Sequence, residues 1–218
     1  MNTLLLRLAG PMQSWGVQSR FSVRDTGLEP SKSGVVGLLC AALGRKREEP
    51  LEDLVALRMG VRVDREGRLS RDYHTAKNVL KANGGIKETE PSSRYYLADA
   101  CFLVGLESED LELLERLNIA LLHPVWPLYL GRKAFIPGEP AAIDDALKAN
   151  NPLFDTLKAY PYLASGDPPV QLRAVLEDIQ GDLVRPDQPL SFASRHFAPR
   201  RVRVIFFSTP AGIGKDVS

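Results

Sequence analysis

The first regular element of the chain has the sequence TLLLRLAGP, residues 3–11. Thr3 to Ala9 form a mostly apolar run of mixed alternation, which predicts a β-strand. The breaker Gly10-Pro11 predicts the end of this strand. Residues 12–30 have no sustained period and therefore predict a long loop.

A short helix is predicted after this loop. Ser31-Lys32-Ser33 offers a helix cap, residues 35–43 form a compact apolar segment, and Gly44 stands where a helix stops.

Further elements follow from hydrophobic periodicity and turn residues. They are a short helix at 51–58, a strand at 59–63, a strand at 95–106, an amphipathic helix with Leu111, Leu114, Leu117 and Leu121 on one side, and a fourth strand near 134–143. A polar, glycine-containing stretch at residues 68–93 separates the two central strands.

This order predicts an α+β fold with the ferredoxin-like (RRM-like) split βαβ palm. Two helices cover one face of an antiparallel sheet in this topology, so we expect the other face and the loops to be available for a ligand. The insertion, at about residues 68–94, should project from the central strands as a hairpin or thumb. We predict a ferredoxin-like domain at residues 1–143 and a smaller β-rich lobe at 144–218, with strands at 171–177 and 201–207.

Composition is typical of a globular protein. The 218 residues are 44% hydrophobic and 25% charged, with 28 basic and 27 acidic side chains, which excludes a disordered chain and a polycation. No apolar window reaches the ~18 residues of a membrane span, and Gly10-Pro11 interrupts the first apolar stretch too early for a signal peptide. We therefore expect a cytoplasmic protein without membrane association.

The balanced total hides segregated charge. Residues 1–47 hold seven basic and two acidic side chains, and residues 62–96 hold eight and five. Residues 194–203 hold four arginines and no acid, whereas residues 139–187 hold nine acids and four bases. A fold that gathers the basic blocks on one face presents a cationic groove to a polyanion. Ordinary solvated charge is the alternative.

Metal and cofactor chemistry has little support in the sequence. Cys40 and Cys101 lie inside apolar runs, so we interpret them as small buried residues. The three histidines, His74, His123 and His196, are too scattered to complete a metal site with these cysteines. We therefore predict no metal and no cofactor.

Two N-terminal segments suit nucleic-acid binding. In GPMQSWG, residues 10–16, Trp15 can supply a stacking face and Gln13 can hydrogen-bond a base edge or a phosphate. The alternative is a tryptophan that plugs the end of the core. Lys32 and Ser33 lie at a helix N-terminus, where free N–H groups and the helix dipole favour phosphate. A simple N-cap explains Ser33 equally well.

The root of the predicted hairpin carries a second set of candidates. The segment RDYHT, residues 71–75, contains Arg71, Tyr73 and His74, which suit a clamp for single-stranded nucleic acid. Tyr73, His74 and Lys77 can also perform metal-free RNA cleavage, in which the histidine exchanges a proton and the lysine stabilises charge on the phosphate. On the other strand of the hairpin, Arg94 can stack on a base.

Two later segments complete the predicted RNA-binding residues. In PLYLGRK, residues 127–133, a glycine beside Arg132 and Lys133 permits close approach of the backbone to phosphate. Arg195 belongs to the acid-free basic block at 194–203.

Several longer strings resemble a known family. They are LRLAGPMQSWG (6–16), PSKSGVVGLLCAALG (30–44), RDYHT (71–75), YYLADACFLVGL (95–106), PLYLGRK (127–133) and FASRHF (192–197). In this order they resemble the fifth Cas protein family of the repeat-associated mysterious protein (RAMP) superfamily, in the form found in Cascade, the type I-E CRISPR surveillance complex. The resemblance spans almost the whole chain and is weakest at the hairpin tip, residues 80–91.

The resemblance implies a ferredoxin-like palm with a thumb that grips the 5′ handle of the CRISPR RNA. It implies a place at the foot of Cascade in antiviral defence, in contact with the backbone subunit and the large subunit, and no catalytic activity. The residues that it places at the RNA are Trp15, Lys32, Arg71, His74, Arg94 and Arg132. Type I-C relatives are endoribonucleases, so metal-independent cleavage of CRISPR repeat RNA by Tyr73, His74 and Lys77 is the alternative. A scaffold that only bridges protein partners is a third interpretation.

Overall fold

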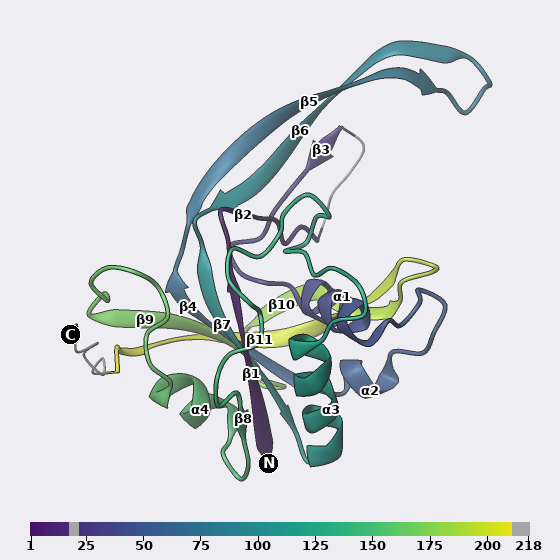
Figure 1. The fold of residues 1–218 in the computed structure, drawn as a ribbon. Helices are drawn as coiled ribbons and strands as arrows, with labels where there is room; N and C mark the ends of the chain where they lie inside the picture. Colours follow the sequence, from purple (N-terminus) through teal and green to yellow (C-terminus); the bar gives the residue numbers. More distant parts are fainter. Residues whose placement is uncertain (18–21, 211–218) are drawn as a thin grey trace.

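The computed structural model describes residues 1–17 and 22–210 as an α+β structure with mostly antiparallel strands (Figure 1). The helices are α1 (Lys32–Leu43), α2 (Glu52–Val55), α3 (Leu111–Leu122) and α4 (Leu153–Ala159). The strands are β1 (Asn2–Ala9), β2 (Met12–Gln13), β3 (Val23–Arg24), β4 (Arg58–Arg65), β5 (Arg68–Leu80), β6 (Ile86–Ala98), β7 (Cys101–Ser108), β8 (Leu147–Lys148), β9 (Gln171–Glu177), β10 (Leu183–Ser191) and β11 (His196–Ser208).

Most strands form one seven-stranded sheet, in the order β10-β11-β9-β4-β7-β1-β8. β7 lies near its centre and pairs antiparallel with β1 on one side and with β4 on the other. In the chain, α1 follows β1 and α3 follows β7. This arrangement of β4, β7, β1 and β8 with two helices is compatible with the predicted ferredoxin-like class.

Two of the strand predictions are wrong: one strand is absent, and the other is two strands. Residues 134–143 form no strand, because Pro137 and Pro140 interrupt the segment. The short strand β8 lies beside β1 instead. The predicted strand at 95–106 is two strands, β6 and β7, which are separated at Asp99, a residue with a left-handed φ of 59°.

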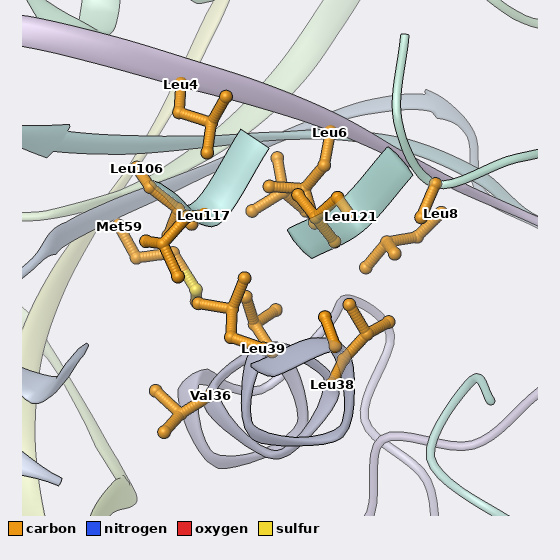
Figure 2. Close-up of a cluster of buried hydrophobic side chains, with 14 of the residues drawn as sticks. Leu4, Leu6, Leu8, Val36, Leu38, Leu39, Met59, Leu106, Leu117 and Leu121 are labelled. Atoms are coloured by element: carbon orange, nitrogen blue, oxygen red, sulfur yellow. The ribbon is translucent and has the colours of Figure 1, made fainter. Parts of the chain in front are cut away.

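The larger core fills the space between the sheet and the helices α1 and α3. Figure 2 shows Leu4, Leu6 and Leu8 of β1 close to Leu39 of α1 and Leu121 of α3. These side chains are at most 4% exposed. Alternate residues of a strand point to the same face, so this face of β1 belongs to the helical layer. The capping pattern confirms the predicted start of α1, since the Ser31 side chain accepts a hydrogen bond from the Gly34 N–H.

The opposite face of the sheet is also covered, so the expectation of an open ligand-binding face is wrong. Leu5 of β1 and Leu103 of β7 are fully buried in a second cluster. This cluster includes Leu153 and Leu157 of α4. The apolar residues at both even and odd positions of β1 are consistent with burial on two faces.

The C-terminal strands continue the same sheet. β9 pairs with β4, and β11 pairs with β9. The predicted strands at 171–177 and 201–207 are confirmed as β9 and as part of β11, whereas β10 was not predicted. The division of the chain into domains at residue 143 stays a prediction, because a shared sheet does not define where folding units end.

A buried ion pair attaches the segment after α4 to β4. The Arg62 Nε lies 2.6 Å from Asp64 Oδ1, and both side chains are fully buried. The Arg62 guanidinium also donates to the carbonyl oxygens of Leu157, Tyr160 and Pro161. Every polar atom of a buried charge requires such a partner, so the pair defines where this segment lies.

Cys40 and Cys101 are buried free thiols, as predicted. Burial raises the pKa of Cys40 to about 11 and that of Cys101 to about 12. None of the helices within residues 1–17 and 22–210 has the length and apolar character that crossing a membrane requires. The same part of the chain contains no group of three His, Cys, Asp or Glu side chains that could hold a metal ion.

We expect Asp64→Ala to lower the free energy of unfolding by about 3 to 5 kcal/mol, because it leaves the Arg62 guanidinium buried without its counter-charge. Urea denaturation measures this loss. Glu139→Ala is the control, since Glu139 pairs with Arg7 while 55% exposed, and its loss should cost less than about 1 kcal/mol. Equal losses of stability in the two variants would contradict the conclusion that Asp64 compensates a buried charge.

Candidate nucleic-acid interface

The hairpin β5–β6 continues the central ladder of the large sheet. Arg65 lies opposite Cys101, and Arg68 lies opposite Ala98. The register of β4 on β7 shifts by one residue between Val63 and Arg65, so an irregularity in the ladder precedes the hairpin. Gly67 and Asp99 lie between these pairs, one on each strand, and both have left-handed backbones, with φ of 76° and 59°. The hairpin bends here and projects away from the body of the protein (Figure 1). β5 and β6 thus form a hairpin over residues 68–98, four residues longer than the predicted insertion at 68–94, and its role as a thumb stays a prediction.

The N-terminal loop lies along the other edge of β6. β2 pairs antiparallel with residues 97 and 98, and β3 pairs parallel with residues 93 and 94. β5 therefore occupies one edge of β6, while β2 and β3 occupy the opposite edge. This arrangement brings Arg24 of β3 opposite Arg94 of β6.

Three arginines meet at the root of the hairpin; we call Arg24, Arg94 and Arg132 the arginine cluster. Arg132 Nη2 donates to the carbonyl oxygens of Arg24, at 3.3 Å, and of Tyr95, at 2.9 Å. Its guanidinium carbon lies 5.4 Å from the centroid of the Phe135 ring. A planar guanidinium held by carbonyl oxygens and an aromatic ring has little rotational freedom.

The arginine cluster has an excess of positive charge. Burial lowers the pKa of Arg132, and the nearby cations Arg94 and Arg24 lower it further, whereas Asp25 and Asp72 oppose this shift. Arg132 Nη1 is buried and has no hydrogen-bond partner within the part of the chain that the structure describes. An unpartnered buried donor is unfavourable. Arg24 is exposed and Arg94 is half-buried, so these are the guanidiniums of the cluster that an anionic oxygen can reach. The cluster is therefore suited to a phosphate group.

The two faces of the hairpin carry different residues. Side chains directly opposite each other in an antiparallel pair share a face. Asp72 lies opposite Arg94, so this face includes the arginine cluster, and it also includes His74, whose ring contacts the Asp72 carboxylate. Arg71 and Tyr73 lie on the other face and are exposed.

This alternation separates the three residues of the cleavage hypothesis. Tyr73 and Lys77 are an even number of residues apart in β5 and share a face, whereas His74 points to the opposite face. A general acid–base pair must reach the same reacting atoms. The hairpin geometry keeps these three side chains from a common site.

Two predicted RNA-binding residues lie in the protein core. Trp15 is 1% exposed, and its ring packs against Gly34 of α1. The interpretation of Trp15 as a core plug is confirmed, and no stacking face is offered to solvent. Gln13 is fully buried and donates to the carbonyl oxygens of Leu8 and Ala100, while its Oε1 accepts from the Trp15 indole.

The predicted phosphate site at the N-terminus of α1 is already filled by carboxylates. The Lys32 N–H donates to Asp187 Oδ2 at 2.8 Å, and Lys32 Nζ lies 2.9 Å from Glu177 Oε2. The Lys32 side chain is only 2% exposed, and burial lowers its pKa. Ser33, half-buried, lies 3.3 Å from the capping Ser31 hydroxyl, measured between the two Oγ atoms.

The remaining candidates lie at the surface. Lys133 follows Arg132 and is exposed. Arg195 is exposed in the turn between β10 and β11, at the outer edge of the large sheet, with a φ of 54°. Of the predicted residues, the structure thus brings Arg94 and Arg132 together. Arg24 was not among the predicted contacts, since only its pairing with β6 reveals its position.

Gly131 determines where the loop that carries Arg132 packs. Its φ is 87°, and a Cβ at this position would lie 1.7 Å from the Ser14 carbonyl oxygen. Ser14 N–H in turn donates to the Leu130 carbonyl oxygen at 3.1 Å. Only glycine allows this close contact between the two loops.

We expect Gly131→Ala to destabilise the protein well beyond the ~1 to 2 kcal/mol of a left-handed alanine, because the Cβ would displace Ser14. Gly166→Ala is the matched control, since Gly166 has a φ of 91° and a Cβ placed there would meet no atom within 4 Å. Urea denaturation of both variants measures the difference. Similar losses would show that the contact with Ser14 is unimportant.

Comparison with known proteins places the chain among CRISPR-associated proteins. A family model described as CRISPR-associated protein (Cas_Cas5) matches residues 3–203. The CRISPR system Cascade subunit CasD of Escherichia coli strain K12 is 39% identical over an aligned length of 147 residues, and the match covers 60% of this chain. The matched region spans 65% of that relative, just under two thirds of its length.

Two solved structures are similar over nearly the full chain. One, described as the crystal structure of a Cas protein, is 47% identical, with a TM-score of 0.80 over 97% of this chain and 100% of that chain. The other, described as a CRISPR RNA-guided surveillance complex, is 35% identical, with a TM-score of 0.81 over 98% and 95%. Together with the family match, these similarities show that the chain belongs to the Cas5 family of CRISPR-associated proteins.

Proposed function

We propose that this protein is a non-catalytic RNA-binding subunit of Cascade that holds the 5′ handle of the CRISPR RNA in antiviral defence. The observation that carries the proposal is the arginine cluster at the root of the hairpin, where Arg24 lies opposite Arg94 and both lie near Arg132. The similarity to the Cascade subunit CasD and to a CRISPR RNA-guided surveillance complex supports the same function. The partners are then the CRISPR RNA, the backbone subunit and the large subunit, in the cytoplasm.

Phosphate contacts supply most of the affinity in this proposal. Arg24, Arg94 and Arg132 neutralise backbone phosphates and release counterions, which makes binding dependent on salt. The hairpin acts as the thumb. Tyr73, which is 65% exposed, can stack on an unpaired base from the other face, and such a stack contributes ~1 to 3 kcal/mol. A single-stranded RNA that crosses the open edge of β5 can contact both faces of the hairpin.

The absence of catalysis is supported by the hairpin geometry. Tyr73 and Lys77 lie on the face opposite His74, so a single phosphate cannot be reached by all three side chains. The CRISPR RNA in this proposal is a ligand that stays bound. Base pairing with the guide then reads the target, while the protein holds one end of the guide in register.

We expect Arg94→Ala to weaken binding to a fluorescein-labelled CRISPR repeat RNA about tenfold, since one charge-assisted contact is lost. The slope of log K against log salt should fall by roughly one. Fluorescence anisotropy over a salt series measures both values. Arg116→Ala is the charge-matched control, because Arg116 lies on α3 and is 60% exposed. Unchanged affinity for Arg94→Ala would refute the proposal and favour a protein scaffold.

We expect the purified chain to leave the same repeat RNA intact in the absence of added metal. Denaturing gel electrophoresis after prolonged incubation measures cleavage, with His74→Ala as the paired variant. Specific cleavage that disappears in His74→Ala would establish the endoribonuclease alternative and contradict a purely binding role.

A further inference from the structure

An ion-pair network outside the arginine cluster connects β9 to the bend of the hairpin. Arg173 of β9 donates from Nε and Nη2 to the two carboxylate oxygens of Glu66, both at 2.8 Å. Its Nη1 donates to Glu29 Oε2 at 3.0 Å. Arg185 holds the other oxygen of Glu29 at 2.7 Å. One guanidinium thus carries three hydrogen bonds to two carboxylates, and these hydrogen bonds raise its pKa.

Both carboxylates belong to segments that lead to the arginine cluster. Glu66 immediately precedes Gly67, the left-handed residue of the bend, and stands two residues before β5. Glu29 lies in the loop that follows Arg24 of β3. Arg173 therefore fixes the start of the hairpin and the loop behind β3 to the same strand of the large sheet.

The position of the start of β5 depends on this ion-pair network more than the position of β6 does. β6 is held on its second edge by β2 and β3, and the Asp99 N–H donates to the Pro11 carbonyl oxygen. Among residues 1–17 and 22–210, β6 is the only strand that pairs with β5, so the other edge of β5 is open there. The side chains of Arg173 and Glu29 are 16% and 10% exposed, so solvent screens their ion pair only partly. Glu66 is 56% exposed, and its bidentate geometry rather than burial holds it to Arg173.

We infer that Arg173 is a positioning residue that acts through Glu66 and Glu29 to hold the hairpin bend and the β3 loop in the geometry that the RNA needs. This inference rests on the proposed function. Arg173 touches no RNA in this arrangement. Its contribution is preorganisation, because a groove that is already formed loses less conformational entropy when the strand binds.

The direction in which the RNA affinity changes when Glu66 is neutralised distinguishes a positioning role from simple electrostatic attraction. Glu66→Gln removes a negative charge, so long-range attraction alone predicts tighter binding of a polyanion. If Glu66 anchors the bend, the same substitution weakens binding. Glu115→Gln removes an equal charge from an exposed site on α3, which lies in the body of the protein away from the hairpin (Figure 1), and serves as the matched control.

The experiment measures binding of the fluorescein-labelled CRISPR repeat RNA to the full-length protein by anisotropy. We expect Glu66→Gln and Arg173→Met each to bind about fivefold more weakly, equivalent to ~1 kcal/mol. Glu115→Gln and Arg116→Met should bind as the parent does within about twofold. Urea midpoints verify that each variant is folded, and Glu66→Gln keeps the test valid if Arg173→Met fails to fold.

Amide hydrogen exchange of the RNA-free protein supplies a second readout. We expect faster exchange at residues 68–72 in Glu66→Gln and Arg173→Met, with the exchange of β7 unchanged. Parent-like or tighter RNA binding by Glu66→Gln, alongside a weakened Arg94→Ala, overturns the positioning role and leaves the proposed function standing. Unchanged binding by Arg94→Ala instead refutes the proposed function, and the positioning role is refuted with it.

Discussion

The pairing of β7 on both of its edges is the constraint on which the rest of the structure depends. β1 and β4 flank it, its residues are buried on both faces, and the hairpin strand β6 leads into it two residues upstream. β7 thereby anchors the end of β6, whose own pairing sets the orientation of Arg94, and a slip of one residue in β6 would turn each of its side chains to the other face. Arg94 would then point away from Arg132. The position of the arginine cluster is thus determined by apolar packing in the centre of the sheet.

Charge counting along the chain overestimated the cationic surface, because many basic side chains have local partners. Arg62, Arg173 and Arg200 pair with carboxylates, as does Lys32. Two of these partners, Glu177 and Asp187, come from the acidic block at residues 139–187, which the fold places beside α1. At the hairpin root, Arg24, Arg94 and Arg132 lie close together, with Asp25 and Asp72 as the nearby acids. The separate acidic and basic blocks of the sequence therefore form ion pairs with each other beside α1. At the hairpin root, basic side chains instead form a localised site suited to an anion.

Hydrophobic periodicity predicted the elements whose partners are regular, including β1, α1, α3 and β9. It did not predict β8, because backbone hydrogen bonds alone define that short strand. It also did not predict that α4 covers the second face of the large sheet, because α4 is far from β1 in the sequence. The chemistry of the side chains alone did not distinguish Trp15 and Gln13, which lie in the core, from Arg94 and Arg132, which lie at the hairpin root. Burial of a loop residue depends on which distant segment packs on it, and Gly34 and Ala100 are 19 and 87 residues away from their respective partners Trp15 and Gln13. Arg24 could be identified only once β3 was seen beside β6.

The two native thiols have a practical consequence for observing the hairpin in motion. Cys40 and Cys101 are enclosed in the core, and their raised pKa keeps them protonated in neutral buffers. A maleimide fluorophore would therefore react selectively with a cysteine introduced at the exposed Glu88 near the end of the hairpin. With a second dye on the RNA, the native background would permit single-molecule distance measurements without first removing either natural cysteine.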